Sequence, residues 1–221
     1  MKTLAIISQK GGAGKTTLAI HIAVAAHRAG YSTAILDMDP QGTAEAWAQW
    51  RSDEEPAVVS AKASTLARTL EKAQAAGADI VVIDTPPLAE AEAREAARAA
   101  DLVLIPCRPR AFDLHAIRTT ADLARFAGKP AFAVFNAAPP RAPTLYAEAK
   151  AVVEQIGLHV APVILADRAA FHHSTGGGKA AQEIEPDSKA AEEVSKLWEW
   201  LCEQVNLSSR NRVNTLTRAR A

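Results

Sequence analysis

The sequence predicts an α/β protein, in which a mostly parallel, twisted β-sheet carries helices on both faces and forms three layers in a single domain. Short apolar runs alternate along the chain with longer, alanine-rich stretches, and this alternation of strand and helix is typical of a parallel sheet. The apolar runs are rich in Val, Ile and Leu with little polar alternation, as expected of strands buried on both faces. A glycine, the usual helix stop, closes four of the helical stretches: Gly30, Gly77, Gly128 and Gly157.

In chain order, the apolar runs predict strands at residues 3–8, 33–37, 57–60, 80–84, 102–106, 131–136 and 161–165. Helices are expected to begin near Lys15, Thr43, Ser64, Ala89, Asp113, Thr144 and Asp167. The Pro-rich residues 138–143 predict a surface loop, and the glycines of residues 174–179 predict a flexible one. Residues 1–206 contain no obvious linker and are predicted to form one domain. Residues 207–221 are polar and carry four arginines without an acidic residue, which indicates a basic, flexible tail.

Composition narrows the classes of function. The 221-residue chain is 48% hydrophobic, enough for a sizeable core, and its 25 basic and 25 acidic residues give a formal net charge of zero. No global charge draws it to nucleic acid, so any DNA contact would need a local patch. The two cysteines form no metal motif. We expect a soluble, cytoplasmic protein without a signal peptide or membrane span, because the first apolar run is short and leads into a glycine-rich loop.

That glycine-rich loop is the most informative motif of the chain. The run K-G-G-A-G-K-T-T occupies residues 10–17, directly after the first predicted strand. Glycines let backbone N–H groups converge on anionic oxygens, and the N-terminus of the following helix adds its positive dipole end. Lys15 can reach the β- and γ-phosphates, and the Thr16 hydroxyl can ligate Mg²⁺. The loop therefore predicts a nucleotide site formed by Gly11, Gly12, Ala13, Gly14, Lys15, Thr16 and Thr17.

Three aspartates follow predicted strands. Asp37 and Asp39 end the second strand and Asp84 ends the fourth, and ligands of open parallel sheets bind at that edge. Mg²⁺ keeps several waters and takes only one or two protein ligands, so Thr16 and Asp84 would suffice beside phosphate oxygens, with Asp84 acting through a coordinated water. Alternatively, Asp37 or Asp39 caps the helix that follows Gly42.

The standard P-loop pattern places glycine at position 9, whereas this chain has Gln9 followed by Lys10. This deviant Walker A motif, the D-x-D-P-Q run and the apolar strand ending at Asp84 together resemble the ParA/MinD family of deviant-Walker ATPases, most closely its short ParA-type partitioning members. The resemblance implies a P-loop NTPase fold with ATP and Mg²⁺ as cofactors. It also implies that Lys10 crosses a dimer interface to the partner's nucleotide, and that Asp39 positions the attacking water. Asp37 would help to fix the magnesium shell or the switch loop.

Weaker matches extend the resemblance. The run I-P-C-R-P at residues 105–109 is similar to a family segment, although Cys107 and Arg108 stand where small or hydroxyl residues are often seen. Asn136, at a strand end, is a candidate for hydrogen bonding the adenine edge, with a simple asparagine turn as the alternative. Pro162 and Asp167 could flank the base.

The resemblance implies a function as well as a site. Such an ATPase dimerises with ATP, binds DNA without sequence preference while associated with the nucleoid, and partitions a plasmid or chromosome with a ParB-like centromere-binding partner that stimulates its slow hydrolysis. Candidate DNA contacts are Arg168, Lys179, Lys189, Arg210 and Arg212. The alternative is a MinD-like ATPase that positions proteins. Membrane binding is not expected, because the tail offers few bulky apolar residues for an amphipathic helix.

Overall fold

The computed structural model describes residues 1–207 and contains a seven-stranded sheet in the order β3-β2-β4-β1-β5-β6-β7. Every strand pair is parallel, which confirms the predicted fold class. The strands are β1 Lys2–Ile6, β2 Thr33–Asp37, β3 Ala57–Ser60, β4 Ile80–Asp84, β5 Leu102–Cys107, β6 Ala131–Phe135 and β7 His159–Val160. Most of the predicted tail, with Arg210 and Arg212, lies outside the described residues.

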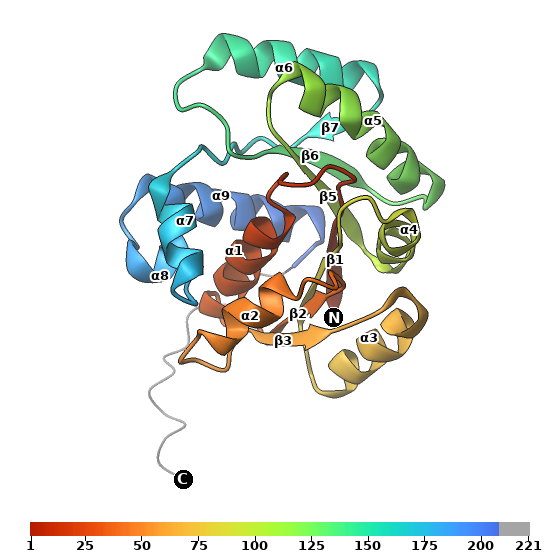
Figure 1. The fold of residues 1–221 in the computed structure, drawn as a ribbon, viewed down its shortest axis with the longest axis vertical. Coiled ribbons are helices and arrows are strands. Elements are labelled where there is room, and N and C mark those ends of the chain that lie inside the picture. The colour runs from red at the N-terminus through yellow and green to blue at the C-terminus, as the bar shows by residue number, and fades with distance from the viewer. Residues whose placement is uncertain (208–221) are drawn as a thin grey trace.

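Helices cover both faces of the sheet (Figure 1). One face carries α1 Lys15–Arg28, α2 Thr43–Gln49, α7 Ala169–Gly176, α8 Ala181–Ile184 and α9 Lys189–Gln204. The other face carries α3 Leu66–Ala75, α4 Glu90–Ala99, α5 Ala111–Phe126 and α6 Pro143–Gln155, with a short 3-10 turn η1 Ala63–Thr65 before α3. Among the described residues, none of these helices is long and apolar enough to cross a membrane.

Successive side chains of each central strand point to opposite faces of the sheet and pack into two separate hydrophobic cores. Ile6 and Val82 pack with α1 and α9, whereas Val81 and Ile83 pack with α4 and α5 on the opposite face. Both faces are therefore buried, which explains why these strands show no polar alternation. Full burial of one such aliphatic side chain stabilises the fold by roughly 1.5–3 kcal/mol.

The seventh strand differs from its prediction. A strand was expected at residues 161–165, but regular pairing is confined to His159–Val160. The Ala161 N–H still donates to the Ala133 carbonyl at 2.8 Å. The next residue is Pro162, which has no N–H to donate, so the ladder cannot continue through it.

The prediction of a flexible glycine loop at residues 174–179 is also wrong. Helix α7 continues to Gly176, and Gly178 is buried at φ +69°. A Cβ on Gly178 would lie 2.5 Å from the carbonyl carbon of Trp50. The glycine thus permits a close backbone contact between the α7–α8 connection and the end of α2.

Candidate nucleotide-binding site

The predicted site residues meet at the carboxyl edge of the sheet because of strand register. Ile6 of β1 lies opposite Asp84 of β4, and Asp84 lies opposite Asp37 of β2. The glycine-rich loop leaves β1 at this level and enters α1 at Lys15. Strand order and register thus bring the loop and two aspartates to one edge, where open parallel sheets bind ligands.

Lys15 is buried at the start of α1. Burial lowers the pKa of its ammonium group, while the nearby Asp84 and Asp39 carboxylates raise it. A cation held in a desolvated loop favours an anionic ligand, and the N–H groups at the first turn of α1 present donors to the same place. The loop therefore fits the phosphates of a nucleotide.

Asp84 supplies the clearest indication of a cation. It is fully buried, and neither carboxylate oxygen has a hydrogen-bond partner among the described residues. Burial raises its pKa to about 7, and the nearby Thr16 hydroxyl and the Lys15 charge lower it in part. The Thr16 hydroxyl is close enough to interact with the carboxylate but does not form a hydrogen bond of regular geometry with either oxygen. A buried carboxylate without a partner is costly, and Mg²⁺ bound near Thr16 would compensate it. In the described part of the chain, no three His, Cys, Asp or Glu side chains gather into a metal cage.

The Asp37 carboxylate accepts hydrogen bonds from backbone N–H groups of the segment that follows β2. One oxygen accepts from the Asp39 N–H at 3.0 Å, and the other accepts from the Ala44 and Glu45 N–H groups at 2.9 and 3.2 Å. Asp37 therefore caps the N-terminus of α2 and orders the connection to it. These contacts favour the switch-loop role for Asp37 and also match the helix-cap alternative. Asp39 is partly exposed nearer the loop tip and accepts from the Gln41 N–H at 2.9 Å.

Lys10 is held within its own chain in this structure. Its Nζ lies 2.8 Å from Asp113 Oδ1, in the first turn of α5. Asp113 is buried, whereas the Lys10 side chain is 39% exposed. The lysine thus lies at the surface of the loop, beside a carboxylate that neutralises it.

Of the three residues predicted to contact the base, one is buried against the P-loop and two are exposed. The Asn136 amide is buried beneath the loop, and its Nδ2 donates to the Ala13 carbonyl at 2.9 Å. Pro162 and Asp167 are exposed, and the Asp167 carboxylate lies 3.3 Å from His172 Nε2. The structure brings Asn136, but not Asp167, into contact with the P-loop.

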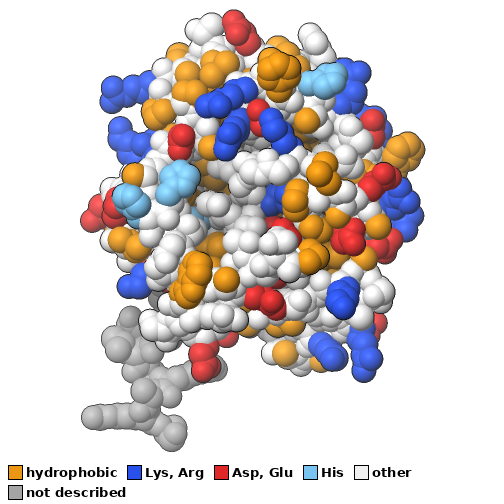
Figure 2. All heavy atoms as spheres, in the orientation of Figure 1, with side chains coloured by type: hydrophobic (Ala, Val, Ile, Leu, Met, Phe, Trp, Pro, Cys, Tyr) orange, Lys and Arg blue, Asp and Glu red, His pale blue; other side chains and the backbone are white. Residues whose placement is uncertain are grey.

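The three predicted DNA contacts within the described residues differ in their surroundings. Arg168 is paired with Glu193 through contacts of 2.6 and 3.1 Å, which raise the pKa of its guanidinium. Lys179 and Lys189 are exposed, but Lys189 follows the acidic run around Glu185. Figure 2 shows acidic and basic side chains interspersed on the visible face, in keeping with the net charge of zero.

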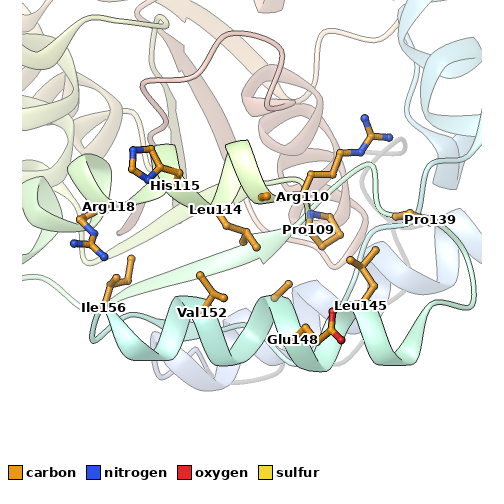
Figure 3. Close-up of a pocket in the computed structure, with 12 residues that line it drawn as sticks. Pro109, Arg110, Leu114, His115, Arg118, Pro139, Leu145, Glu148, Val152 and Ile156 are labelled. Atoms are coloured by element: carbon orange, nitrogen blue, oxygen red, sulfur yellow. The ribbon is translucent and has the colours of Figure 1, made fainter.

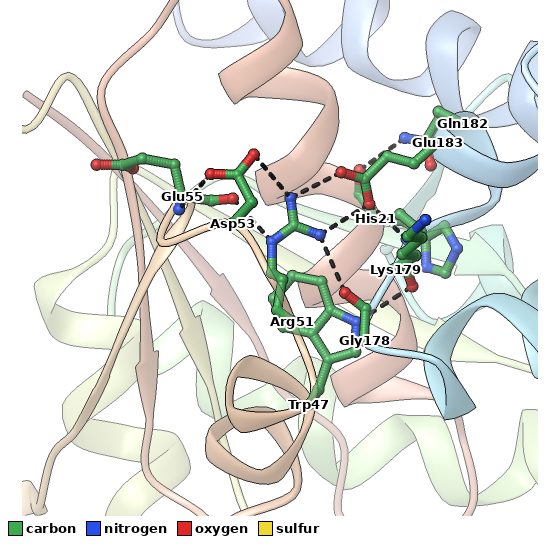
Figure 4. A network of polar contacts seen from close by, with 10 residues as sticks. His21, Trp47, Arg51, Asp53, Glu55, Gly178, Lys179, Gln182 and Glu183 are labelled. Atoms are coloured by element: carbon green, nitrogen blue, oxygen red, sulfur yellow. Dashed lines mark hydrogen bonds and ion pairs between the residues drawn. The ribbon is translucent and has the colours of Figure 1, made fainter.

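A polar network that the sequence did not reveal connects α2 with the α7–α8 connection (Figure 4). The Arg51 side chain is 3% exposed and forms two hydrogen bonds with Glu183, at 2.7 and 2.9 Å. The same guanidinium donates to the Gly178 carbonyl and lies over the Trp47 ring, whose Nε1 donates to the Lys179 carbonyl. The sequence gives no local signal for this contact beyond the opposite charges of Arg51 and Glu183, because the two residues are 132 positions apart.

His21 ties the same region to the P-loop helix. Its Nδ1 donates to the Thr17 carbonyl at 2.7 Å, and its Nε2 accepts from the Ala181 N–H at 3.1 Å. These two contacts require the neutral imidazole with the proton on Nδ1. Burial lowers the pKa of His21 to about 4. A neutral histidine therefore joins α1 to the start of α8.

This burial predicts acid sensitivity of the fold. The unfolded chain takes up a proton at His21 near pH 6.5, whereas the folded chain does so only near pH 4. The free energy of unfolding is therefore unaffected by protonation of His21 above the pKa of the unfolded chain. It falls by up to about 3 kcal/mol as pH drops from that pKa to the lower pKa of the folded chain. When pH is lowered from about 7 to about 4.5, the free energy of unfolding should fall by roughly 2–3 kcal/mol more for the wild type than for His21→Gln. Denaturant unfolding of both proteins at each pH measures this difference. Parallel pH profiles for the two proteins would contradict this prediction.

A separate groove of about 550 Å³ lies between α5 and α6 (Figure 3). Its floor is apolar and its rim is charged, with lining residues that include Leu114, Leu145, Val152, Ile156, Arg110, Arg118 and Glu148. None of the P-loop residues lines it. The groove forms between two consecutive helices, which flank β6 in the chain, and is distinct from the nucleotide site.

Comparison with known proteins agrees with this geometry. Residues 4–178 match the CobQ/CobB/MinD/ParA nucleotide binding domain family. A maintenance of carboxysome distribution protein A from Halothiobacillus neapolitanus is 29% identical over 204 residues, covering 88% of this chain and 94% of that protein. Its counterpart from Gloeobacter kilaueensis is 31% identical over 209 residues, covering 89% and 95%.

A solved structure shows the same fold. The cell division ATPase MinD of Pyrococcus furiosus superposes with a TM-score of 0.72 at 18% identity, covering 91% of this chain and 98% of that one. The family match spans the glycine-rich loop, both aspartate-bearing strand ends and Asn136. The chain therefore belongs to the ParA/MinD family of nucleotide-binding ATPases.

Proposed function

We propose that this chain is a Mg²⁺-dependent ATPase that dimerises on ATP, binds DNA without sequence preference and moves a cargo held by a partner protein. One observation carries the proposal: beside the glycine-rich loop, buried Lys15 lies near the buried carboxylate of Asp84, whose oxygens have no hydrogen-bond partner among the described residues. This pairing of a cation with an unsatisfied carboxylate suits a nucleotide phosphate together with Mg²⁺.

The proposed chemistry is transfer of the γ-phosphoryl group to water. Such transfers need positioning and charge neutralisation more than covalent catalysis. Lys15 and the loop N–H groups would hold the phosphates, and Thr16 and Asp84 would hold Mg²⁺, which neutralises charge when bound. Asp39, partly exposed near the loop, would orient the attacking water.

Dimerisation would require Lys10 to exchange partners. In this structure it is paired with Asp113 of its own chain. Because the Lys10 side chain is 39% exposed, it can leave that carboxylate without unfolding the loop and reach the nucleotide of a second copy. Slow hydrolysis would persist until a partner completes the site.

The expected cargo is DNA, a plasmid or chromosome held by a ParB-like centromere-binding protein. Non-specific DNA contacts would come from Lys179 and Lys189, which are exposed, rather than from Arg168, whose charge is paired with Glu193. The protein would then reside on the nucleoid in its ATP-bound state.

A protein assembly is the second candidate cargo. Two relatives that match about nine-tenths of this chain are named for carboxysome distribution, which favours this alternative. Cross-linking in cells with ATP-bound Asp39→Ala protein would identify the partner. A partner that binds one DNA sequence supports partitioning, and one that binds a protein assembly supports the second candidate.

DNA binding is tested directly with random-sequence duplex by fluorescence anisotropy, with ATP, ADP or no nucleotide, at about 50 and about 200 mM salt. Binding is expected only with ATP and should weaken steeply with salt, because lysine contacts to phosphates release counterions. Lys179→Ala combined with Lys189→Ala should weaken binding, whereas Lys150→Ala, an exposed lysine on α6, serves as the matched control. ATP binding without DNA binding in any state would remove DNA from the proposal.

A further inference from the structure

Two side chains hold consecutive carbonyls of the P-loop. Arg108, which follows β5, donates from Nη2 to the Gly12 carbonyl at 3.3 Å, and Asn136, which follows β6, donates from Nδ2 to the Ala13 carbonyl at 2.9 Å. We infer that Arg108 and Asn136 are positioning residues for phosphate binding, which aim the Ala13 and Gly14 N–H groups at the nucleotide. The inference rests on the proposed function, which places the nucleotide phosphates in this loop.

The argument follows from the planar trans peptide. In each peptide unit, the C=O and the N–H point in opposite directions. The Gly12 carbonyl shares its unit with the Ala13 N–H, and the Ala13 carbonyl shares its unit with the Gly14 N–H. A side chain that fixes either carbonyl therefore also fixes the direction of the paired N–H. Phosphate binding by a loop depends on several such N–H groups converging before the ligand arrives.

Asn136 and Gly14 form a matched pair. Asn136 is 8% exposed, and its own N–H donates to the Cys107 carbonyl at 2.9 Å, which fixes its backbone at the strand end. A Cβ on Gly14 would overlap the Asn136 amide nitrogen, and Gly14 adopts φ +87°. Gly14 is thus needed both for its backbone conformation and for the close approach of Asn136. This packing assigns the amide to the phosphate loop rather than to the adenine edge.

Arg108 acts on the neighbouring peptide unit. Its side chain is half-buried, and its Nε is buried with no hydrogen-bond acceptor among the described residues. The contact with Gly12 has a charged donor but is long, at 3.3 Å, so it orients the Gly12 carbonyl less tightly than Asn136 orients that of Ala13. The guanidinium also adds a positive charge beside the loop, which favours an anionic ligand.

The test compares Asn136→Ala and Arg108→Gln with the wild type by calorimetry, using ATP, ADP, GTP and inorganic triphosphate as probes. Each variant should weaken the binding of all four by a similar factor, roughly five- to tenfold, because one hydrogen bond that orients the loop is lost. The ratio of ATP to GTP affinity should stay unchanged. Arg110→Gln, an exposed arginine two residues away that lines the α5–α6 groove, should bind all four like the wild type.

Amide hydrogen exchange gives a second readout that does not depend on nucleotide. In the free protein, exchange at Ala13 and Gly14 should accelerate in both variants, with unchanged exchange in β1 and β4. If Asn136→Ala does not fold, Arg108→Gln and Asn136→Ser, which retains a hydroxyl donor, carry the comparison.

Distinct outcomes would overturn the inference. If Asn136→Ala loses affinity for ATP but binds triphosphate like the wild type, Asn136 recognises adenine and does not position the loop. If both variants bind every probe normally, neither residue positions it. If the wild type itself binds neither ATP nor triphosphate, the proposed nucleotide site fails, and this inference fails with it.

Discussion

Lys15→Ala is expected to weaken ATP binding by roughly a hundredfold, the largest effect on affinity of any single change in the loop. Lys15 is buried, so its charge acts on the phosphates in a desolvated site where water screens it little. A charge-assisted hydrogen bond contributes roughly 1.5–3 kcal/mol, and the loss of its charge from a buried site lies at the upper end. Affinity measured by calorimetry with ATP and Mg²⁺ checks the prediction.

Lys10→Ala is the matched control, because it removes a lysine from the same loop. Lys10 is paired with Asp113 at the surface, so its loss should leave ATP binding to the monomer intact while preventing the ATP-dependent dimer. Thermal unfolding separates binding from folding. At an ATP concentration of about ten times the wild-type Kd, ATP should raise the melting temperature of Lys10→Ala but hardly that of Lys15→Ala, because stabilisation depends on the ratio of ligand concentration to Kd. An affinity of Lys15→Ala within threefold of the wild type would refute the role assigned to Lys15.

The fold could be predicted because its signals are local. Apolar runs, glycine stops and the strand–loop–helix motif each lie within a few residues, and the parallel-sheet rule then determines the edge at which ligands bind. The register that places Asp37 beside Asp84 follows from this geometry. The seventh strand was misplaced because its prediction relied on the apolar composition of residues 161–165 and did not take account of Pro162, which has no N–H for the ladder. The glycines at residues 174–179 predicted a flexible loop, whereas Gly178 is needed because the backbone of Trp50 packs closely against it.

The remainder of the site depends on contacts between distant segments. Arg51 and Glu183 are separated by 132 residues, and His21 and Ala181 by 160. No local pattern distinguishes these side chains from the other charged or histidine residues of the chain. Arg108 gave a partial signal, since it departs from the residue types often seen at its position, but its contact with Gly12 appears only in the fold. Residues that orient a motif are thus harder to predict than residues within it.

Asp39→Ala is expected to lower the rate of ATP hydrolysis by at least a hundredfold while leaving ATP bound, because groups that position or deprotonate the attacking water contribute about 10²–10⁴ to rate. With hydrolysis blocked, the ATP-bound dimer should accumulate, visible by light scattering with ATP but not with ADP. Asp39 also accepts the Gln41 N–H at 2.9 Å, so a loss of rate could arise from a disordered turn rather than from lost chemistry.

Asp39→Asn separates these two causes. The amide oxygen can still accept the Gln41 N–H, so the turn is preserved, but the amide carries no negative charge and is no base. If Asp39 orients or deprotonates water, Asp39→Asn should be nearly as slow as Asp39→Ala and should form the same ATP dimer. If Asp39→Asn hydrolyses ATP at the wild-type rate, the carboxylate only supports the turn, and the water must be oriented by another group. Asp37 could not replace it without giving up its hydrogen bonds to α2, because its two oxygens already accept the N–H groups of Asp39, Ala44 and Glu45.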